Sequence, residues 1–458
     1  LGQDVTQASA ESRSTQYQLE QLTTGDERSV ITLPDGTRTE SLVGTNGSAT
    51  TTDRNGTVTV STNGPDPRFG MQSPIAAITQ VTTPSGLSSV ISAARVVELA
   101  DENNPFSLIR LRDQIDSNGY ISTSEFDVAT KTFTYTSAAG RQAIAVIDEQ
   151  GKILSSRNAT LEPTEYGYDA RGRLISMHSG AGTGARMSAI AYNLNGYVDH
   201  VTDALGRTTS FDYDLAGRVT RQTFPDARAV QFSYDANGNI TSIVPPGRDA
   251  HVFDYTAVNL EERYTPPQLD SALTITHYTY NRDKQLDLIT RPDGQTVDLT
   301  YDAGGRVDSL ITPMGQVNYR YHPASGQLAT ITANDGSTLD YTYDGFLPLT
   351  ETYAGAFTGS VARVYDNKFR VSELHLNGEG IAYDYDNDDL VTNAGALSLD
   401  RDPAHGLLTG TTLGNVTTRH RYSSFGELSD FRADHAGAPL VQQHYNRDSL
   451  VGRQINVS

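Results

Sequence analysis

Three alternating aspartates are the first residues in this sequence whose types and spacing could do chemistry. Asp384, Asp386 and Asp388 are arranged as in the opening of a calcium-binding loop, where alternating carboxylates hold the ion. That loop also needs a glycine at its sixth position and a glutamate at its twelfth, and this sequence has Asp389 and Gly395 there. We therefore interpret the three aspartates as a solvated strand face and turn rather than a cation site.

A glycine-rich stretch is the second candidate. Gly180, Gly182 and Gly184 lie in Ser-Gly-Ala-Gly-Thr-Gly-Ala-Arg, which has no following Lys-Ser or Lys-Thr and does not open a helix. A phosphate cradle needs both features. The stretch predicts a flexible hairpin tip.

Histidines and cysteines offer no metal or cofactor chemistry. The ten histidines show no i, i+4 pairing or other metal-ligand spacing, and we interpret them as strand and turn residues. The chain has no cysteine, which excludes a disulfide framework and cysteine-ligated zinc or iron-sulfur centres. We predict no metal site and no bound cofactor.

Aspartate and tyrosine are abundant enough to raise the question of an enzyme, for example one that acts on polysaccharide. Many of the aspartates lie at turns, several of them directly after a tyrosine, where hydrogen bonds to the turn backbone explain them. Tyrosine and arginine could form sugar-binding platforms or cation–π stacks. Because both recur at fixed positions of a repeat, stacking between repeats is the favoured interpretation, and we predict no catalytic residues and no enzyme activity.

The repeat that must position these residues is clearest between Phe211 and Ile243. Two copies of Tyr-Asp-x-x-Gly, followed by Arg or Asn and an aliphatic residue, stand with Tyr213 and Tyr234 21 residues apart. Before Tyr234, apolar and polar residues alternate with the period of a half-buried strand. After it, Asp-Ala-Asn-Gly is typical of a chain reversal. Each repeat therefore predicts a β-hairpin, which needs neighbours on both sides for stability.

Seven copies of this signature occur, with weaker copies between them, and most spacings are 20 to 25 residues. Their tyrosine and glycine pairs are Tyr168 and Gly172, Tyr192 and Gly196, Tyr213 and Gly217, Tyr234 and Gly238, Tyr301 and Gly305, Tyr321 and Gly326, and Tyr422 and Gly426. The varying spacing favours a sheet whose curvature changes along its length. We predict an all-β fold in which tandem antiparallel hairpins form one continuous, curved or spiral sheet.

The first third of the chain lacks the tyrosine signature but keeps the turn spacing. Turn sequences such as Pro34-Asp35-Gly36 separate short strands rich in Thr and Val. Residues 88–100 are the one place where a short helix competes, and their Val and Ile content favours strands. We therefore divide the chain into divergent hairpin repeats at 1–160, the start of the same sheet, and a YD-repeat region at 161–458.

Charge and hydropathy limit the partners. The formal net charge of −20 argues against nucleic acid or an anionic membrane, since phosphate binding needs the opposite sign. No run of about 18 apolar residues could span a bilayer. The chain begins at Leu1 without a signal sequence and ends in what looks like an interrupted repeat, so we expect it to be a piece of a longer protein.

The signature copies resemble those of the YD-repeat (Rhs) family, which includes bacterial Rhs proteins, the C components of Tc toxin complexes and the animal teneurins. The resemblance is strong over 168–446 and rests on turn spacing alone before that. It implies a long β-ribbon wound into a hollow shell, of which this chain would be part or all, with the tyrosines stacked along one face. Toxin-delivering members also carry a self-cleaving Asp-Pro-x-Gly-type stretch. Nothing from Tyr422 onward matches it, and Asp402-Pro403 lies in an ordinary turn, so no protease residues are assigned.

From this resemblance we expect a structural shell of a secreted or surface-exposed bacterial protein that encloses a C-terminal cargo, such as a toxin, encoded outside this chain. Its partners would be further shell segments and that cargo. The alternative is an extracellular contact module, similar to teneurins, that binds a glycan or a protein on another cell.

Overall fold

The computed structural model describes residues 2–267 and 275–457. The strands of the first third are β1 (Gly2–Ala8), β2 (Ser14–Gln21), β3 (Glu27–Thr32), β4 (Arg38–Val43), β5 (Ala49–Thr52), β6 (Val58–Asp66), β7 (Gly70–Thr82), β8 (Ser88–Leu99), β9 (Leu108–Ser117), β10 (Tyr120–Asp127), β11 (Thr132–Thr136), β12 (Gln142–Ile147) and β13 (Ile153–Asn158). The next strands are β14 (Thr164–Tyr168), β15 (Leu174–Ser179), β16 (Arg186–Tyr192), β17 (Val198–Thr202), β18 (Thr208–Tyr213), β19 (Val219–Thr223), β20 (Ala229–Tyr234), β21 (Ile240–Val244), β22 (His251–Tyr255) and β23 (Glu261–Thr265).

The remaining strands are β24 (Thr276–Tyr280), β25 (Leu286–Thr290), β26 (Thr296–Tyr301), β27 (Val307–Thr312), β28 (Gly315–Tyr321), β29 (Leu328–Ala333), β30 (Thr338–Asp344), β31 (Leu347–Ala354), β32 (Gly359–Tyr365), β33 (Val371–Leu376), β34 (Glu379–Tyr385), β35 (Val391–Ala394), β36 (Leu397–Arg401), β37 (Leu408–Leu413), β38 (Val416–Tyr422), β39 (Leu428–His435), β40 (Ala438–Arg447) and β41 (Gln454–Val457). In the described residues the sole helix is η1 (Gly182–Gly184), a single 3-10 turn.

One topological rule generates the whole structure: each strand pairs antiparallel with the next strand of the chain. The result is a single 41-stranded sheet. The predicted all-β architecture of tandem hairpins is therefore confirmed. The first third belongs to the same sheet, and the ambiguous residues 88–100 contain the strand β8.

The two faces of this ribbon differ in polarity. In β20, Val230, Phe232 and Tyr234 are partly buried on one face, and Gln231 and Ser233 are exposed on the other. We call the first face, which carries the signature tyrosines, the tyrosine face. In the described residues only two large apolar side chains, Val30 and Leu347, are buried, because a single-layer sheet with no second layer has no ordinary core.

A β-bulge accompanies every signature tyrosine. The strand register shifts next to Tyr168, Tyr192, Tyr213, Tyr234, Tyr301, Tyr321 and Tyr422. Bulges bend a strand and increase its twist. A ribbon with a bulge in nearly every hairpin must therefore curve steadily along its length.

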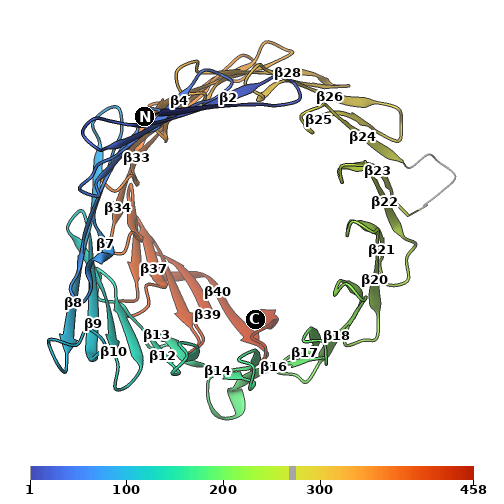
Figure 1. Cartoon of the computed structure of the whole chain (residues 1–458). Helices are drawn as coiled ribbons and strands as arrows, with labels where there is room; N and C mark the ends of the chain where they lie inside the picture. Colours follow the sequence, from blue (N-terminus) through green and yellow to red (C-terminus); the bar gives the residue numbers. More distant parts are fainter. Residues whose placement is uncertain (1, 268–274, 458) are drawn as a thin grey trace.

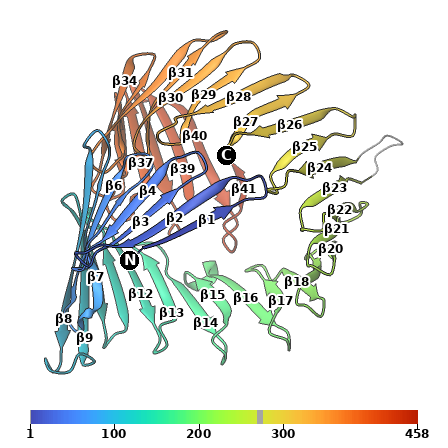
Figure 2. The ribbon, with the colours of Figure 1, turned by 45° about the horizontal axis from the view of Figure 1, so that its top comes forward.

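The curved ribbon closes into a ring and continues as a second turn of a spiral (Figure 1). We call β1–β23 the first wind and β24–β41 the second wind. Figure 2 shows the second wind, coloured yellow to red, lying beside the blue strands of the first. No helix in the described part of the chain is long and apolar enough to cross a membrane.

Candidate functional site: the seam between two winds

In the Tyr-Asp-x-x-Gly-Arg turns, the aspartate, the glycine and the arginine have distinct structural roles. In the turn after β14, the Asp169 carboxylate accepts hydrogen bonds from the backbone N–H groups of Arg171 and Arg173, both at 2.9 Å. The guanidinium of Arg173 returns to the same carboxylate with its Nε at 2.8 Å. Gly172 supplies the left-handed conformation, with φ of 78°, that the reversal requires. The same pattern recurs at Asp214 and Arg218 and at Asp302 and Arg306.

The signature tyrosines tie each repeat to the one before it. The Tyr234 hydroxyl donates a 2.7 Å hydrogen bond to the backbone carbonyl of Val219. The other six signature tyrosines make the same contact, with carbonyl acceptors at Ile153, Leu174, Val198, Leu286, Val307 and Leu408. All seven signature glycines have positive φ, from 72° to 93°.

In three repeats an arginine guanidinium stacks on the signature ring of the next repeat. The guanidinium carbon of Arg173 lies 4.2 Å from the centroid of Tyr192, in the next repeat. Arg218 lies 4.6 Å from Tyr234 in the same way. Tyr213 stacks instead on Tyr197 of the preceding repeat, with their ring centroids 5.0 Å apart. At these four rings the favoured stacking between repeats therefore consists of three cation–π contacts and one tyrosine pair.

The turns of the ribbon form two distinct edges. We call the turns that follow even-numbered strands, which include the turns after all seven signature tyrosines, the signature edge. The turns that follow odd-numbered strands form the opposite edge. At the seam, the signature edge of the second wind lies on the opposite edge of the first wind. The contacts join Arg13 to Asp283, Asp35 to Arg306, Thr83 and Ser85 to Asp344, Asn118 to Asn367, Arg141 to Asp386 and Asp388, and Arg186 to Glu427.

The seam has a constant register. The turn after β1 meets the turn after β24, and the turn after β11 meets the turn after β34, an offset of 23 strands in both cases. Residues joined across it are 241 to 274 positions apart in the sequence. Sequence reasoning missed these pairings because most of the residues occupy ordinary turns. Their partners emerge only after the ribbon has curved through a full ring.

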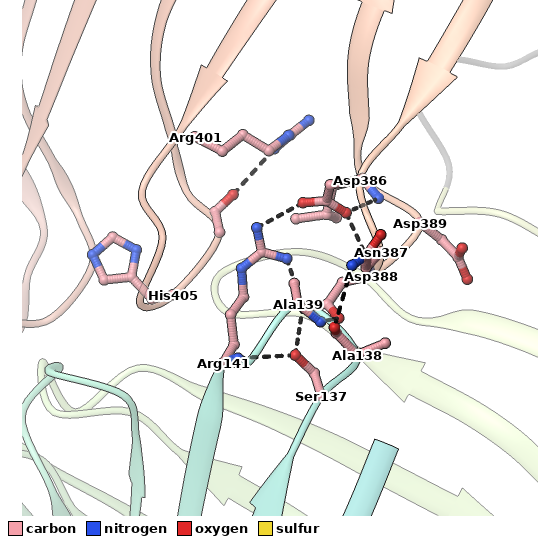
Figure 3. Close-up of polar contacts among 12 residues, drawn as sticks. Ser137, Ala138, Ala139, Arg141, Asp386, Asn387, Asp388, Asp389, Arg401 and His405 are labelled. Carbon is pink, nitrogen blue, oxygen red and sulfur yellow. Dashed lines mark hydrogen bonds and ion pairs between the residues drawn. The ribbon is translucent and has the colours of Figure 1, made fainter. Parts of the chain in front are cut away.

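Arg141 is the centre of one seam contact (Figure 3). Its Nη1 atom lies 2.6 Å from Asp388 Oδ2, and its Nη2 atom lies 2.6 Å from Asp386 Oδ2. Ser137 Oγ and the backbone N–H of Ala139 also donate to Asp388, at 2.6 and 2.8 Å. All three charged side chains are largely buried, so the prediction of a solvated aspartate face is wrong for Asp386 and Asp388. Burial opposes ionisation, but the hydrogen bond from Arg141 holds the pKa of Asp386 below its ordinary value.

Asp344 forms a seam contact without a cation. Its side chain is buried, and its carboxylate accepts hydrogen bonds from Thr83 Oγ1 and Ser85 Oγ, both at 2.6 Å, and from the Ser85 backbone N–H at 2.8 Å. Although burial raises the pKa of Asp344, these hydrogen bonds lower it by more, and the net shift is downward. Asp344 is therefore a charged group that requires the first wind in place.

Arg186 closes the far end of the seam. Its guanidinium binds both carboxylate oxygens of Glu427 at 2.8 Å and lies 3.8 Å from the ring centroid of Phe425. Its Nε donates to the carbonyl of Ser449 at 3.1 Å. A planar guanidinium suits this combination of a two-point ion pair and a stack. The hydrogen bond from Arg186 lowers the pKa of Glu427.

A cleft of about 740 Å³ opens beside Arg141. The partly exposed rings of Phe133 and Tyr135 line it from the first wind, and Lys368, Asp389 and His405 line it from the second. Lys368 lies over the Tyr120 ring, 4.2 Å from its centroid, and pairs with Asp389. The cleft thus combines aromatic surface with charged groups of both signs.

The aspartates at the Arg141 seam contact are also the residues to consider for a metal site or a catalytic carboxylate pair. Within residues 2–267 and 275–457, no three or more His, Asp or Glu side chains gather as metal ligands would. Asp386 and Asp388 are close together, but both are bound by one guanidinium. Both carboxylates are therefore engaged in ion pairs across the seam.

Comparisons with known proteins agree with this geometry. A family model described as the teneurin YD-shell matches residues 2–451. The crystal structure of TcdB2-TccC3-Cdc42 is similar, with 11% identity, a TM-score of 0.51, and coverage of 93% of this chain and 27% of that one. The crystal structure of TcdB2-TccC3 without its hypervariable C-terminal region is also similar, with 12% identity, a TM-score of 0.53, and coverage of 96% of this chain and 27% of that one. This chain therefore spans about a quarter of those chains, and at such low identity the likeness shows the fold alone. No curated protein matches the chain.

Proposed function

This chain belongs to the teneurin YD-shell family, and on that premise we propose that it forms part of the wall of a hollow shell around a polypeptide cargo. The observation that carries the proposal is the seam. A single-layer ribbon encloses nothing unless neighbouring winds also meet along their edges, and Arg141, Arg186 and Asp344 join them there. The role is structural rather than catalytic, as the family supports.

The tyrosine face is the surface we assign to the cargo. In β20 it carries the apolar residues Val230 and Phe232, while Gln231 and Ser233 make the other face polar. At β11 this face bears Phe133 and Tyr135, which line the cleft together with turns of the second wind. In the view of Figure 1 the strands of that part of the second wind lie inside the ring, which supports an inward-facing tyrosine face.

The wall would act by exclusion. Every strand of the described sheet is hydrogen-bonded to its neighbours in the chain, so the wall itself presents few open strand edges to an enclosed chain. An unfolded cargo would meet apolar side chains without meeting a template for strand addition. We place the shell outside the cytoplasm, as a secreted or surface structure, by extension from its family.

A fusion experiment tests this proposal. A protease-sensitive, unstructured reporter is attached after Ser458, and its digestion is followed in the intact chain and in a seam variant carrying Arg141→Ala and Arg186→Ala. The proposal predicts slower digestion in the intact chain than in the seam variant. A matched control carries Arg228→Ala and Arg291→Ala, two arginines that pair within their own turns. Equal digestion in the intact chain and the seam variant would refute enclosure.

The cleft favours a second candidate function, a contact module that binds an extracellular glycan or protein. Exposed aromatic rings flanked by polar groups suit a sugar, which stacks on the ring and bonds to its rim. Binding to a panel of immobilised glycans tests this function, with Tyr135→Ala as the variant. Binding that persists in the variant would rule out the cleft as the site.

A further inference from the structure

The seam uses only part of the available turns. The signature edge of the second wind lies on the opposite edge of the first wind. The other two edges, the signature edge of the first wind and the opposite edge of the second wind, make no such contact within the described residues. Each is nevertheless the direct continuation of an edge that docks elsewhere in the same molecule.

Two leucines stand at the tips of the signature edge of the first wind. Leu194 and Leu215 are the second residues after Tyr192 and Tyr213, in consecutive signature turns, and both are fully exposed, at 101% and 108%. In two docked turns of the second wind the same position holds an asparagine that contacts the first wind: the Asn367 carbonyl accepts from Asn118 Nδ2, and Asn387 Nδ2 donates to the Ala138 carbonyl. These free and docked turns thus have the same backbone structure, but the tip residue is apolar in the two free turns and polar in the two docked turns.

The charged side chains of these leucine-tipped turns, and the polar side chain of Asn193, already have partners within their own turns. The carboxylate of Asp214 pairs with Arg218 of its own turn, and the Asn193 side chain accepts hydrogen bonds from the backbone of its own turn. An apolar partner would therefore face the leucines without leaving a buried charge unpaired. Fully exposed large apolar tips on adjacent turns are the feature expected of a contact surface rather than of a solvated edge.

The opposite edge of the second wind carries matching apolar tips. Met314, in the turn after β27, is 92% exposed, and Phe357, in the turn after β31, is 86% exposed. Both turns follow odd-numbered strands and so belong to the kind of edge that receives signature turns at the seam. The two free edges are thus complementary in kind and in chemistry.

We propose that these edges bind each other between molecules: the signature edge of the first wind in one copy docks on the opposite edge of the second wind in another copy. The contact extends the seam across a molecular boundary. Because the two surfaces differ, the interface is head-to-tail and each docked copy presents a fresh edge, so stacking is open-ended rather than limited to a dimer. Self-association of this kind is independent of whether the shell encloses cargo.

The net charge of the chain and the apolar contact together predict how association between copies depends on salt. Each chain carries a net charge of −20, so two copies repel each other, and the proposed contact is made by apolar tips. Added salt screens the repulsion and leaves the apolar contact in place. Association should therefore strengthen as salt rises, the reverse of what an interface made of ion pairs would show.

Sedimentation velocity over about a hundredfold range of protein concentration tests the proposal, since association is governed by mass action. One variant changes the signature edge, Leu194→Asn with Leu215→Asn, and a second changes the opposite edge, Met314→Asn with Phe357→Asn. All four positions are exposed turn tips, and asparagine already occupies the tips of two docked turns, as Asn367 and Asn387. The control, Val96→Thr, alters an exposed strand residue away from both edges.

The expected result has three parts. The intact chain and the Val96→Thr control form species that grow with concentration and with salt. Each edge variant alone stays monomeric. An equimolar mixture of the two edge variants forms dimers and nothing larger, because it contains one intact edge of each kind. A monomeric intact chain at all concentrations would overturn the proposal, and so would association that the edge variants leave unchanged.

Discussion

Arg306 donates from its Nη1 atom to Asp35 Oδ2 at 2.7 Å, which joins two residues 271 positions apart. The same guanidinium binds Asp302 of its own turn and lies 4.3 Å from the Tyr321 centroid in the next repeat. A residue that belongs to the repeat signature therefore also holds the two winds together. In the second wind, one side chain thus makes both the contacts within the repeats and the contact between the winds.

Replacing this arginine by lysine separates its two roles. Lysine keeps the charge but cannot bind two carboxylates and stack at once. We expect Arg306→Lys to lower the free energy of unfolding by about 2 kcal/mol. Arg218→Lys is the matched control, because Arg218 makes the same contacts with Asp214 and Tyr234 in the first wind. It should cost only about 1 kcal/mol, from the ladder contacts alone. Equal losses in urea denaturation would contradict a seam role for Arg306.

The tyrosine hydroxyl is the next target. Tyr234→Phe removes the hydrogen bond to the Val219 carbonyl and keeps the ring under Arg218. We expect a loss of about 1 kcal/mol in the free energy of unfolding. Tyr135→Phe, at a half-exposed ring in the first third of the chain, should change the free energy by less than half of that amount. A Tyr234→Phe chain as stable as the parent would show that the hydroxyl is dispensable.

Two glycines allow the cost of a left-handed backbone to be measured separately from the cost of a steric clash. Gly217 and Gly336 have nearly equal φ angles, 81° and 82°. A methyl group added at Gly217 would collide with the Tyr197 ring, whereas at Gly336 it would meet open space. Both alanine variants should lose about 1 kcal/mol for the left-handed backbone, and Gly217→Ala should lose about 1 to 2 kcal/mol more. Thermal unfolding of the two variants measures the difference, and indistinguishable midpoints would contradict it.

Acid should open the seam before it melts the sheet. Asp344, Asp386 and Glu427 all have a pKa below the ordinary value in the folded protein. A lowered folded pKa means that the stabilisation is complete above the unfolded pKa and is lost as pH falls through the folded pKa. The loss therefore begins near pH 4, where free carboxyl groups titrate, and is completed below it.

X-ray scattering and far-UV circular dichroism, recorded together during acid titration, test this order of events. The radius of gyration should rise in acid while the β-sheet signal persists, because backbone hydrogen bonds do not titrate in this range. Simultaneous loss of both signals would mean that the seam and the sheet are a single cooperative unit.

The residues explain which features could be predicted from the sequence. The period of Tyr-Asp-x-x-Gly predicts hairpins because alternation and turn chemistry are local, and Gly172 and Asp169 do what those rules require. The role of Arg173 on the Tyr192 ring is also readable as a recurrence. The division of the chain at residue 160 stays a prediction.

The seam could not be predicted in the same way. Whether Asp388 faces water or Arg141 depends on curvature summed over 23 strands, to which every bulge contributes. No spacing rule links residues 247 positions apart. Sequence reasoning therefore assigns Asp386 and Asp388 to solvent, because only the local turn can be read from the sequence.

The distance between residues 138 and 387 tests the spiral seam most directly. The chain has no cysteine, so Ala138→Cys and Asn387→Cys can carry a pair of spin labels without background. Because Asn387 Nδ2 contacts the Ala138 carbonyl at 3.4 Å, electron paramagnetic resonance should give one narrow, short distance that broadens in acid. A broad or long distribution at neutral pH would show that the winds do not meet there, and the proposed wall would not be closed.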